Sequence, residues 1–359
     1  MTLKLLSFAP SGAIVAAPTT SLPEPIGGER NWDYRYCWLR DAVYTVRCFF
    51  KLGYTDEATA FVLWLMHATT LTAPALKVLY ALCGETFLPQ KNLELLEGYK
   101  GSQPVRTGNR AYTQYQLDIY GDVLDSLLLY VQGGGAVDRE MGRRLIEMAD
   151  LVVSEWSLPD HGIWEVAGPR RHYVHSKVMC WVALDRAKQI VQRLQLRADL
   201  HAWEKAGDAI RQCVRDGGFS SRLKSFVQTL GGEHVDATAL TFSLSGFVDP
   251  HDPGMISTID VVRNTLGRKD LLYRYLMEDG LPGQEGAFLA CSFWLVEALA
   301  VTGRTHEAEK LFEKLQERAN DVGLYPEQVL PSDGRMLGNF PQALTHLSHI
   351  SAALRLYSR

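Results

Sequence analysis

The sequence has few cysteines, and no two of them are spaced as a CxxC pair. The six cysteines, at positions 37, 48, 83, 180, 213 and 291, lie mostly in apolar segments of helical character. Disulfide frameworks belong to small secreted domains, whereas buried thiols in helical segments behave as small hydrophobic residues. We therefore expect reduced cysteines and a cytoplasmic protein.

Long apolar runs and a marked excess of charge are also missing. No run approaches the ~20 apolar residues that a membrane-spanning helix needs. Residues 1–18 contain one lysine and are interrupted by Pro10 and Gly12, a pattern that argues against a signal peptide. The formal net charge of -4 and the pI of about 6.2 offer no basic surface. Nucleic acid and membrane are therefore not expected as partners.

Strand signals are scarce, since only residues 3–8 and 13–17 resemble strands. From Asp41 onward apolar residues recur with a helical period. Beyond two early helices that meet at Gly53, the pattern predicts helices over residues 120–131, 139–155, 176–194, 199–215, 237–247, 257–266, 287–302, 305–319 and 343–357. The chain of 359 residues exceeds the usual single domain, but an all-helical toroid reaches this length as one unit. The predicted fold class is all-α.

Four long tracts without helical period interrupt this pattern, at residues 88–113, 158–175, 278–286 and 323–341. Long loops on a helical scaffold are usually functional or disordered, and these carry Trp, Tyr, Glu and Arg, which favours function. The densest polar and aromatic stretch, residues 27–41, ends in Arg40-Asp41 directly before an apolar run. Such a pair either caps a helix as an ion pair or binds a polar ligand such as a sugar.

Two carboxylates in these loops are candidates for acid–base catalysis. Glu165 stands among apolar neighbours in Gly162-Ile163-Trp164-Glu165-Val166, where desolvation should raise its pKa. Glu327 follows Pro326, which restricts the backbone and presents the side chain from a rigid loop. A single loop glutamate is more often a solvated surface residue. Two carboxylates across a sugar-sized cleft are, however, the minimum machinery of glycoside hydrolysis.

Several motifs in this order resemble glycoside hydrolase family 15, the family of glucoamylases, glucodextranases and bacterial-type trehalases. The motifs are Arg30-Asn31-Trp32-Asp33-Tyr34-Arg35-Tyr36-Cys37-Trp38-Leu39-Arg40-Asp41, Gln116-Leu117-Asp118, Gly162-Ile163-Trp164-Glu165, Tyr273-Arg274-Tyr275, Glu285-Gly286-Ala287, Pro326-Glu327-Gln328 and Gly338-Asn339-Phe340-Pro341. The resemblance covers essentially the whole chain. It implies an (α/α)6 toroid of six helical hairpins with the site in the loops at one end.

The resemblance also implies roles for individual residues. Glu165 matches the general acid and Glu327 the general base of an inverting, exo-acting hydrolase of α-glucosides such as maltodextrin or trehalose. The residues that match substrate contacts are Trp38, Arg40, Asp41, Trp164, Arg274 and, less closely, Glu285. An oligosaccharide or disaccharide is the implied partner, and no cofactor is implied. A non-catalytic carbohydrate-binding or regulatory protein on the same scaffold is the alternative.

The chain departs from the family pattern in three respects. Family members usually carry a β-sandwich domain before the toroid, so residues 1–26 are expected to be the end of a linker and residues 27–359 the catalytic domain. Ala167 and Val329 stand where Arg and Tyr are expected.

His172-x-x-His175 near His161 invites a metal site, but a fourth ligand is missing, and we expect no metal.

Overall fold

The computed structural model describes residues 1–283 and 285–357. Gln284 in the predicted loop 278–286 and the last two residues of the predicted domain 27–359 lie outside this part. The helices fall into two groups according to how many of their sides are buried. Helices α4 (Ile119–Gln132) and α9 (Leu289–Val301) are buried on nearly all sides, whereas α5 (Arg139–Glu155), α7 (Leu200–Gly217) and α10 (Thr305–Gln316) bury one face only. Helices of the first kind belong in the interior, and helices of the second kind cover them.

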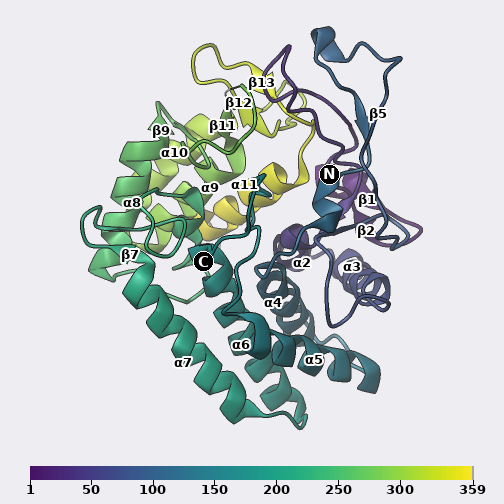
Figure 1. Cartoon of the computed structure of the whole chain (residues 1–359), viewed down its shortest axis with the longest axis vertical. Coiled ribbons are helices and arrows are strands. Elements are labelled where there is room, and N and C mark those ends of the chain that lie inside the picture. The colour runs from purple at the N-terminus through teal and green to yellow at the C-terminus, as the bar shows by residue number, and fades with distance from the viewer. Residues whose placement is uncertain (284, 358–359) are drawn as a thin grey trace.

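The contacts between elements arrange these helices in two concentric layers. The inner ring consists of α2 (Ala42–Lys51), α4 (Ile119–Gln132), α6 (Val174–Leu194), the 3-10 helix η4 (Ala237–Thr241), α9 (Leu289–Val301) and α11 (Ala343–Tyr357). The outer layer consists of α3 (Thr55–Ala68), α5 (Arg139–Glu155), α7 (Leu200–Gly217), α8 (Pro253–Leu266) and α10 (Thr305–Gln316), while the short α1 (Thr2–Leu6) packs against α11. Helix α11 also packs against α2, which closes the ring (Figure 1).

Two predicted elements are wrong. Residues 237–247 form only a short 3-10 helix, because Asp236 accepts a hydrogen bond from the N–H of Thr238 and Gly246 adopts a positive φ of 81°. Residues 3–8 form α1 and the two-residue strand β1 (Ser7–Phe8), because burying Leu3 and Leu6 together requires a helical turn. The helices α5 and α11, by contrast, have the predicted bounds.

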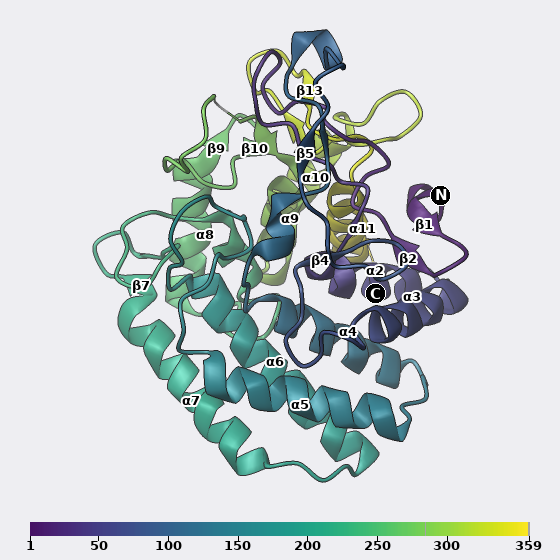
Figure 2. The ribbon, with the colours of Figure 1, turned by 45° about the vertical axis from the view of Figure 1, so that its right-hand side comes forward.

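Short strands brace the loops at the end of the ring where the inner helices begin. The pairs are β1 with β2 (Ala13–Ile14), β3 (Cys37–Trp38) with β4 (Leu79–Tyr80), β5 (Lys91–Asn92) with β6 (Arg106–Thr107), β7 (Phe219–Ser220) with β8 (Ser225–Phe226) and β9 (Gly267–Arg268) with β10 (Leu271–Leu272). A three-stranded sheet joins β11 (Ala287–Phe288), β12 (Gln328–Val329) and β13 (Met336–Leu337). Strands β5 and β13 lie at the same end of the molecule in both views (Figures 1 and 2).

The N-terminal segment is bound to the far end of the chain. The N–H of Gly338 donates to the carbonyl of Pro23 over 2.9 Å, and the N–H of Ala343 donates to the carbonyl of Ala16 over 2.7 Å. Thr19 donates a side-chain hydrogen bond to Asn339. Segments more than 300 residues apart in the sequence therefore form one wall of the ring.

Two further sequence expectations concern thiols and membranes. All six cysteines have free thiols in the part of the chain that the structure describes, and four of them are buried. Across residues 1–283 and 285–357, no helix combines the length and the hydropathy needed to cross a bilayer.

Candidate active site

The loops that precede the inner helices bring most of the predicted site residues together. Arg40 and Asp41 form the 3-10 helix η1 (Leu39–Asp41) directly before α2, and Glu165 precedes α6. Arg274 follows β10, and Glu327 directly precedes β12. The inner helices thus direct their N-terminal ends, which carry the positive end of the helix dipole, toward one group of polar side chains.

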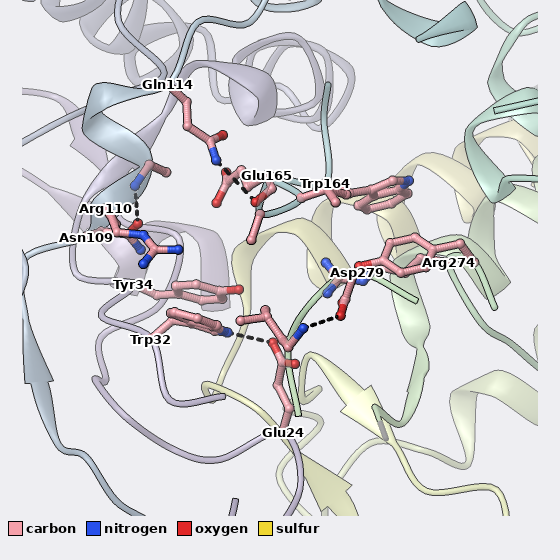
Figure 3. A pocket seen from close by; sticks show the side chains of 15 residues that line it. Glu24, Trp32, Tyr34, Asn109, Arg110, Gln114, Trp164, Glu165, Arg274 and Asp279 are labelled. Atoms are coloured by element: carbon pink, nitrogen blue, oxygen red, sulfur yellow. Dashed lines mark hydrogen bonds between the residues drawn. The ribbon is translucent and has the colours of Figure 1, made fainter. Parts of the chain in front are cut away.

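Two adjoining cavities lie between these loops. The inner cavity has a volume of about 410 Å³ and is lined by Ala16, Tyr34, Trp38, Arg40, Asp41, Ile163, Trp164, Glu165, Arg274, Phe288, Glu327 and Gln342. The outer cavity, of about 590 Å³, is shown in Figure 3. Tyr34, Trp164, Glu165 and Arg274 line both. Glu165 therefore stands at the junction, whereas Glu327 lines the inner cavity.

Glu165 is held in an unusual backbone conformation. Its φ of 58° lies in the left-handed region, which is rare for a residue other than glycine and is typical of strained functional positions. Trp38 donates its indole N–H to Oε1 over 2.6 Å, and Nη1 of Arg40 lies 3.5 Å from the same oxygen. Burial raises the pKa of Glu165 above its usual value, although Arg40 and Trp38 oppose the shift. A carboxyl group of this kind can carry a proton to a leaving oxygen.

Glu327 is almost fully buried, with 1% of its surface exposed. The hydroxyl of Tyr34 donates to Oε1 over 2.7 Å, but no residue of the described chain donates a hydrogen bond to Oε2. Burial raises the pKa of Glu327 to about 7, against the effects of Tyr34 and Arg274. Glu327 lines the inner cavity, and its ionised carboxylate is suited to accept a proton from a water molecule there.

An aromatic pair links the two carboxyl groups. The rings of Tyr34 and Trp38 meet edge to face with centroids 5.3 Å apart, and each ring donates a hydrogen bond to one carboxylate. Tyr34 was not among the residues predicted for the site. It stands in the motif before Trp38, but the sequence does not reveal its contact with Glu327, which is 293 residues away.

Arg40 and Asp41 form the ion pair that the sequence suggested, and they also face the inner cavity. Nε of Arg40 lies 3.1 Å from Oδ1 of Asp41, and Nη1 donates to the carbonyl of Ile163 over 3.0 Å. Burial raises the pKa of Asp41, although Arg40 opposes the shift. Both side chains line the cavity wall, so the ion pair and a contact with a sugar are compatible.

Trp164 and Arg274 are oriented by acidic residues behind them. The single indole N–H of Trp164 is shared between the two carboxylate oxygens of Asp236, at 3.0 and 2.9 Å, and the guanidinium of Arg274 lies 5.6 Å from the Trp164 ring centroid. Glu285 accepts hydrogen bonds from Arg274 and lines a neighbouring hollow rather than these two cavities. Asp236 was missed by the sequence reasoning, because its role depends on its place in the fold.

The two departures from the family pattern lie in different places. Ala167 lines the outer cavity, whereas Val329 is buried in β12 opposite Ala287 of β11.

The three histidines near Glu165 do not converge. His161 accepts a hydrogen bond from the N–H of Tyr115, His172 is exposed, and His175 is buried against Phe242. Among the described residues there is no group of three or more His, Cys, Asp or Glu side chains arranged to hold a metal ion.

Gly338 has no side chain, and the Glu327 carboxyl group occupies the space that a side chain at position 338 would need. We expect Gly338→Ala to reduce activity by more than about tenfold. A Cβ at this position would lie 2.3 Å from Oε2 of Glu327, and the φ of 76° disfavours any side chain. The Glu327 side chain would therefore have to move. Steady-state kinetics and a thermal melt of Gly338→Ala, compared with Gly323→Ala, measure the effect. Gly323 has a similar φ of 77° but open space around its Cβ, so it reports backbone strain alone. Equal losses in both variants would contradict the steric argument.

The buried Glu327 also predicts how stability depends on pH. Its pKa rises from about 4.5 in an unfolded chain to about 7 in the folded protein. The folded state therefore binds more protons between these values, and stability falls as the pH rises from about 4.5 to 7. Glu327→Gln removes this dependence, so its melting temperature should exceed that of the wild type by a margin that grows across this window and stays constant above it. Thermal melts from pH 4 to 8 test this, with the exposed Glu29→Gln as control. A margin independent of pH would contradict it.

A ring of helical hairpins with one buried and one partly buried carboxyl group in the loops at one end is the architecture of the (α/α)6 glycosidases. The chain belongs to glycosyl hydrolases family 15, whose family model matches residues 1–354.

Known relatives and solved structures agree with this assignment. The chain is 40% identical over 362 residues to a trehalase of Mycobacterium tuberculosis, covering 99% of this chain and 53% of that protein. It is 38% identical over 357 residues to a trehalase of Thermoplasma volcanium, covering 99% of this chain and 57% of that protein. The chain thus spans a little over half the length of these curated relatives. A bacterial glucoamylase complexed with acarbose superposes with a TM-score of 0.75 at 16% identity, covering 99% of this chain and 54% of that one. The predicted family and the (α/α)6 fold are confirmed.

Proposed function

We propose that this chain is an exo-acting, inverting α-glucoside hydrolase and that trehalose is its substrate. The observation that carries the proposal is the placement of the two carboxyl groups. Glu165 stands where the two cavities meet, and Glu327 lines the inner one. A disaccharide with one ring in each cavity would present its bridging oxygen to Glu165 and the anomeric carbon of the inner ring to Glu327.

The reaction then needs one proton transfer at each carboxyl group. Glu165 donates its proton to the bridging oxygen as the bond from that oxygen to the anomeric carbon breaks. Glu327 removes a proton from a water molecule, whose oxygen bonds to the same carbon from the opposite face. One water is consumed, Glu165 ends ionised and Glu327 protonated, and the attacked glucose emerges as the β-anomer.

The inner cavity supplies the groups that would hold a terminal glucose. Arg40 and Asp41 offer a donor and an acceptor for hydroxyls, and Trp38 and Trp164 offer aromatic surface. We choose trehalose as the proposed substrate among the α-glucosides because both curated relatives reported above are trehalases. The outer cavity, where Ala167 replaces the expected Arg, is where the substrates would differ.

The products of trehalose give a direct test by proton NMR. Inversion at one of the two α-linked carbons should release α- and β-glucose in equal amounts before mutarotation, because the leaving glucose keeps its own configuration. Retention would release only α-glucose and would overturn the role of Glu327 as a base. Maltose and isomaltose run in parallel identify the substrate. Failure to release glucose from any of the three by a folded protein would favour a non-catalytic role.

A further inference from the structure

Glu24 is a buried acidic residue in the outer cavity that the proposed mechanism does not use. It lies between Pro23 and Pro25 in the N-terminal segment, and its N–H donates to the carbonyl of Arg30 over 3.1 Å. Only 2% of its surface is exposed, although it lines the cavity wall. In Figure 3 its carboxyl group enters the pocket on the side opposite Glu165.

One oxygen of this carboxyl group lacks a partner. Trp32 donates its indole N–H to Oε1 over 3.0 Å, whereas no donor within residues 1–283 and 285–357 reaches Oε2. The nearest cation, Nη1 of Arg30, lies 4.0 Å from Oε2 and is bound to Asp279 and Glu285 at 2.7 and 2.5 Å. A buried oxygen without a donor is costly, so the site favours a ligand with a hydroxyl group there.

The position of Glu24 identifies which part of a substrate it would meet. Glu165 lines both cavities, but Glu24 lines the outer one, on the leaving-group side of the acid. Asn109, Arg110 and Gln114 line the same cavity and add further polar groups. We propose that Glu24 binds a hydroxyl group of the departing sugar and thereby selects glycosides whose leaving group is itself a sugar. This inference rests on the proposed function and adds a specificity-determining residue to it.

Two other roles for Glu24 make different predictions. It could hold Trp32, whose ring also carries the guanidinium of Arg106 at 4.8 Å from its centroid. It could instead act on Glu327 through charge, since burial raises the pKa of Glu24 well above its usual value and the nearby charges of Glu285 and Glu327 add to the shift. The first role would appear as lost stability, and the second would affect every substrate.

Two substrates separate these roles. Trehalose has a sugar leaving group, whereas α-D-glucosyl fluoride has a leaving group without hydroxyls. Glu24→Ala should lower kcat/KM for trehalose by about 10- to 100-fold, as expected for a hydrogen bond to an ionisable group, and leave glucosyl fluoride within about threefold. Glu24→Gln keeps an acceptor for Trp32, so its melting temperature should not fall below that of the wild type, while trehalose hydrolysis should still fall. Glu29→Gln removes one charge from an exposed side chain nearby and should change neither reaction.

Three other results with these variants overturn the inference. Equal losses on both substrates would place the effect at Glu327 or the inner cavity, and no loss on either would show that Glu24 binds nothing. If Glu24→Ala loses trehalose hydrolysis and melts at a lower temperature while Glu24→Gln does neither, Glu24 has a structural role through Trp32. If the wild type cleaves glucosyl fluoride but not trehalose, the proposed substrate is wrong, and the same comparison on whichever of maltose or isomaltose is cleaved decides the role of Glu24. If the wild type cleaves none of them, the proposed function fails, and calorimetric binding of trehalose to the wild type and Glu24→Gln decides, with equal affinities contradicting the inference.

Discussion

Glu327→Gln should lower the rate of trehalose hydrolysis by about 10²–10⁴-fold. The amide keeps an oxygen that can accept the 2.7 Å hydrogen bond from Tyr34, so the side chain should stay in place. It cannot, however, remove a proton from water. Steady-state kinetics measure the loss, and a thermal melt verifies the fold.

A chemical rescue identifies the missing group. Glu327→Ala opens space beside Gly338, and azide admitted to that space should attack the anomeric carbon and form β-glucosyl azide, because the nucleophile approaches from the face that water uses. Formation of α-glucosyl azide would instead place the attacking group on the other face.

Tyr34→Phe, which removes the hydroxyl bound to Glu327, should lower the rate of trehalose hydrolysis less, by about tenfold, since it removes one hydrogen bond and leaves the carboxylate.

Glu165→Gln should lower trehalose hydrolysis by a similar factor of about 10²–10⁴, because the amide N–H is not acidic enough to transfer a proton. Its effect should depend on the leaving group. Fluoride leaves without a full proton transfer, so α-D-glucosyl fluoride should retain much more of its rate than trehalose. Comparing kcat for the two substrates measures the difference.

The matched control is Glu155→Gln, which replaces another partly buried glutamate outside both cavities that accepts a hydrogen bond from Tyr115. It should leave both substrates near the wild-type rate. An equal loss on both substrates in Glu165→Gln would mean that Glu165 holds the glucose and that another group supplies the proton.

The sequence predicts the helices well wherever their surface pattern is regular. The bounds of α5 and α11 follow from the spacing of their apolar residues. The period fails at residues 237–247, where the Asp236 side chain accepts from the backbone N–H of Thr238, the Thr241 hydroxyl donates to the carbonyl of Thr238, and Gly246 turns the chain. Local hydrogen bonds of this kind compete with a helix and leave no mark on hydrophobic periodicity.

The site is predicted less completely than the fold. Glu165 and Glu327 stand in motifs, and the structure places both at the inner cavity. Tyr34 and Asp236 gain their positions from contacts with residues distant in the sequence, and Glu24 lies in a segment that pairs with the far end of the chain, which no spacing reveals. The N-terminal segment shows this most clearly, since residues expected to be the end of a linker supply a wall of the outer cavity through Glu24.

Closure of the ring by distant segments has a consequence during synthesis on the ribosome. The inner cavity requires Ala16 and Trp38 from the start of the ring and Glu327 and Gln342 from its last hairpin. A nascent chain can form the hairpins of α4 to α7 early, but the pocket stays incomplete until the segment around Gln342 has left the exit tunnel. Contacts of such long sequence separation are slow to form. We therefore expect activity to appear as the last step of folding, after most of the helical signal has developed.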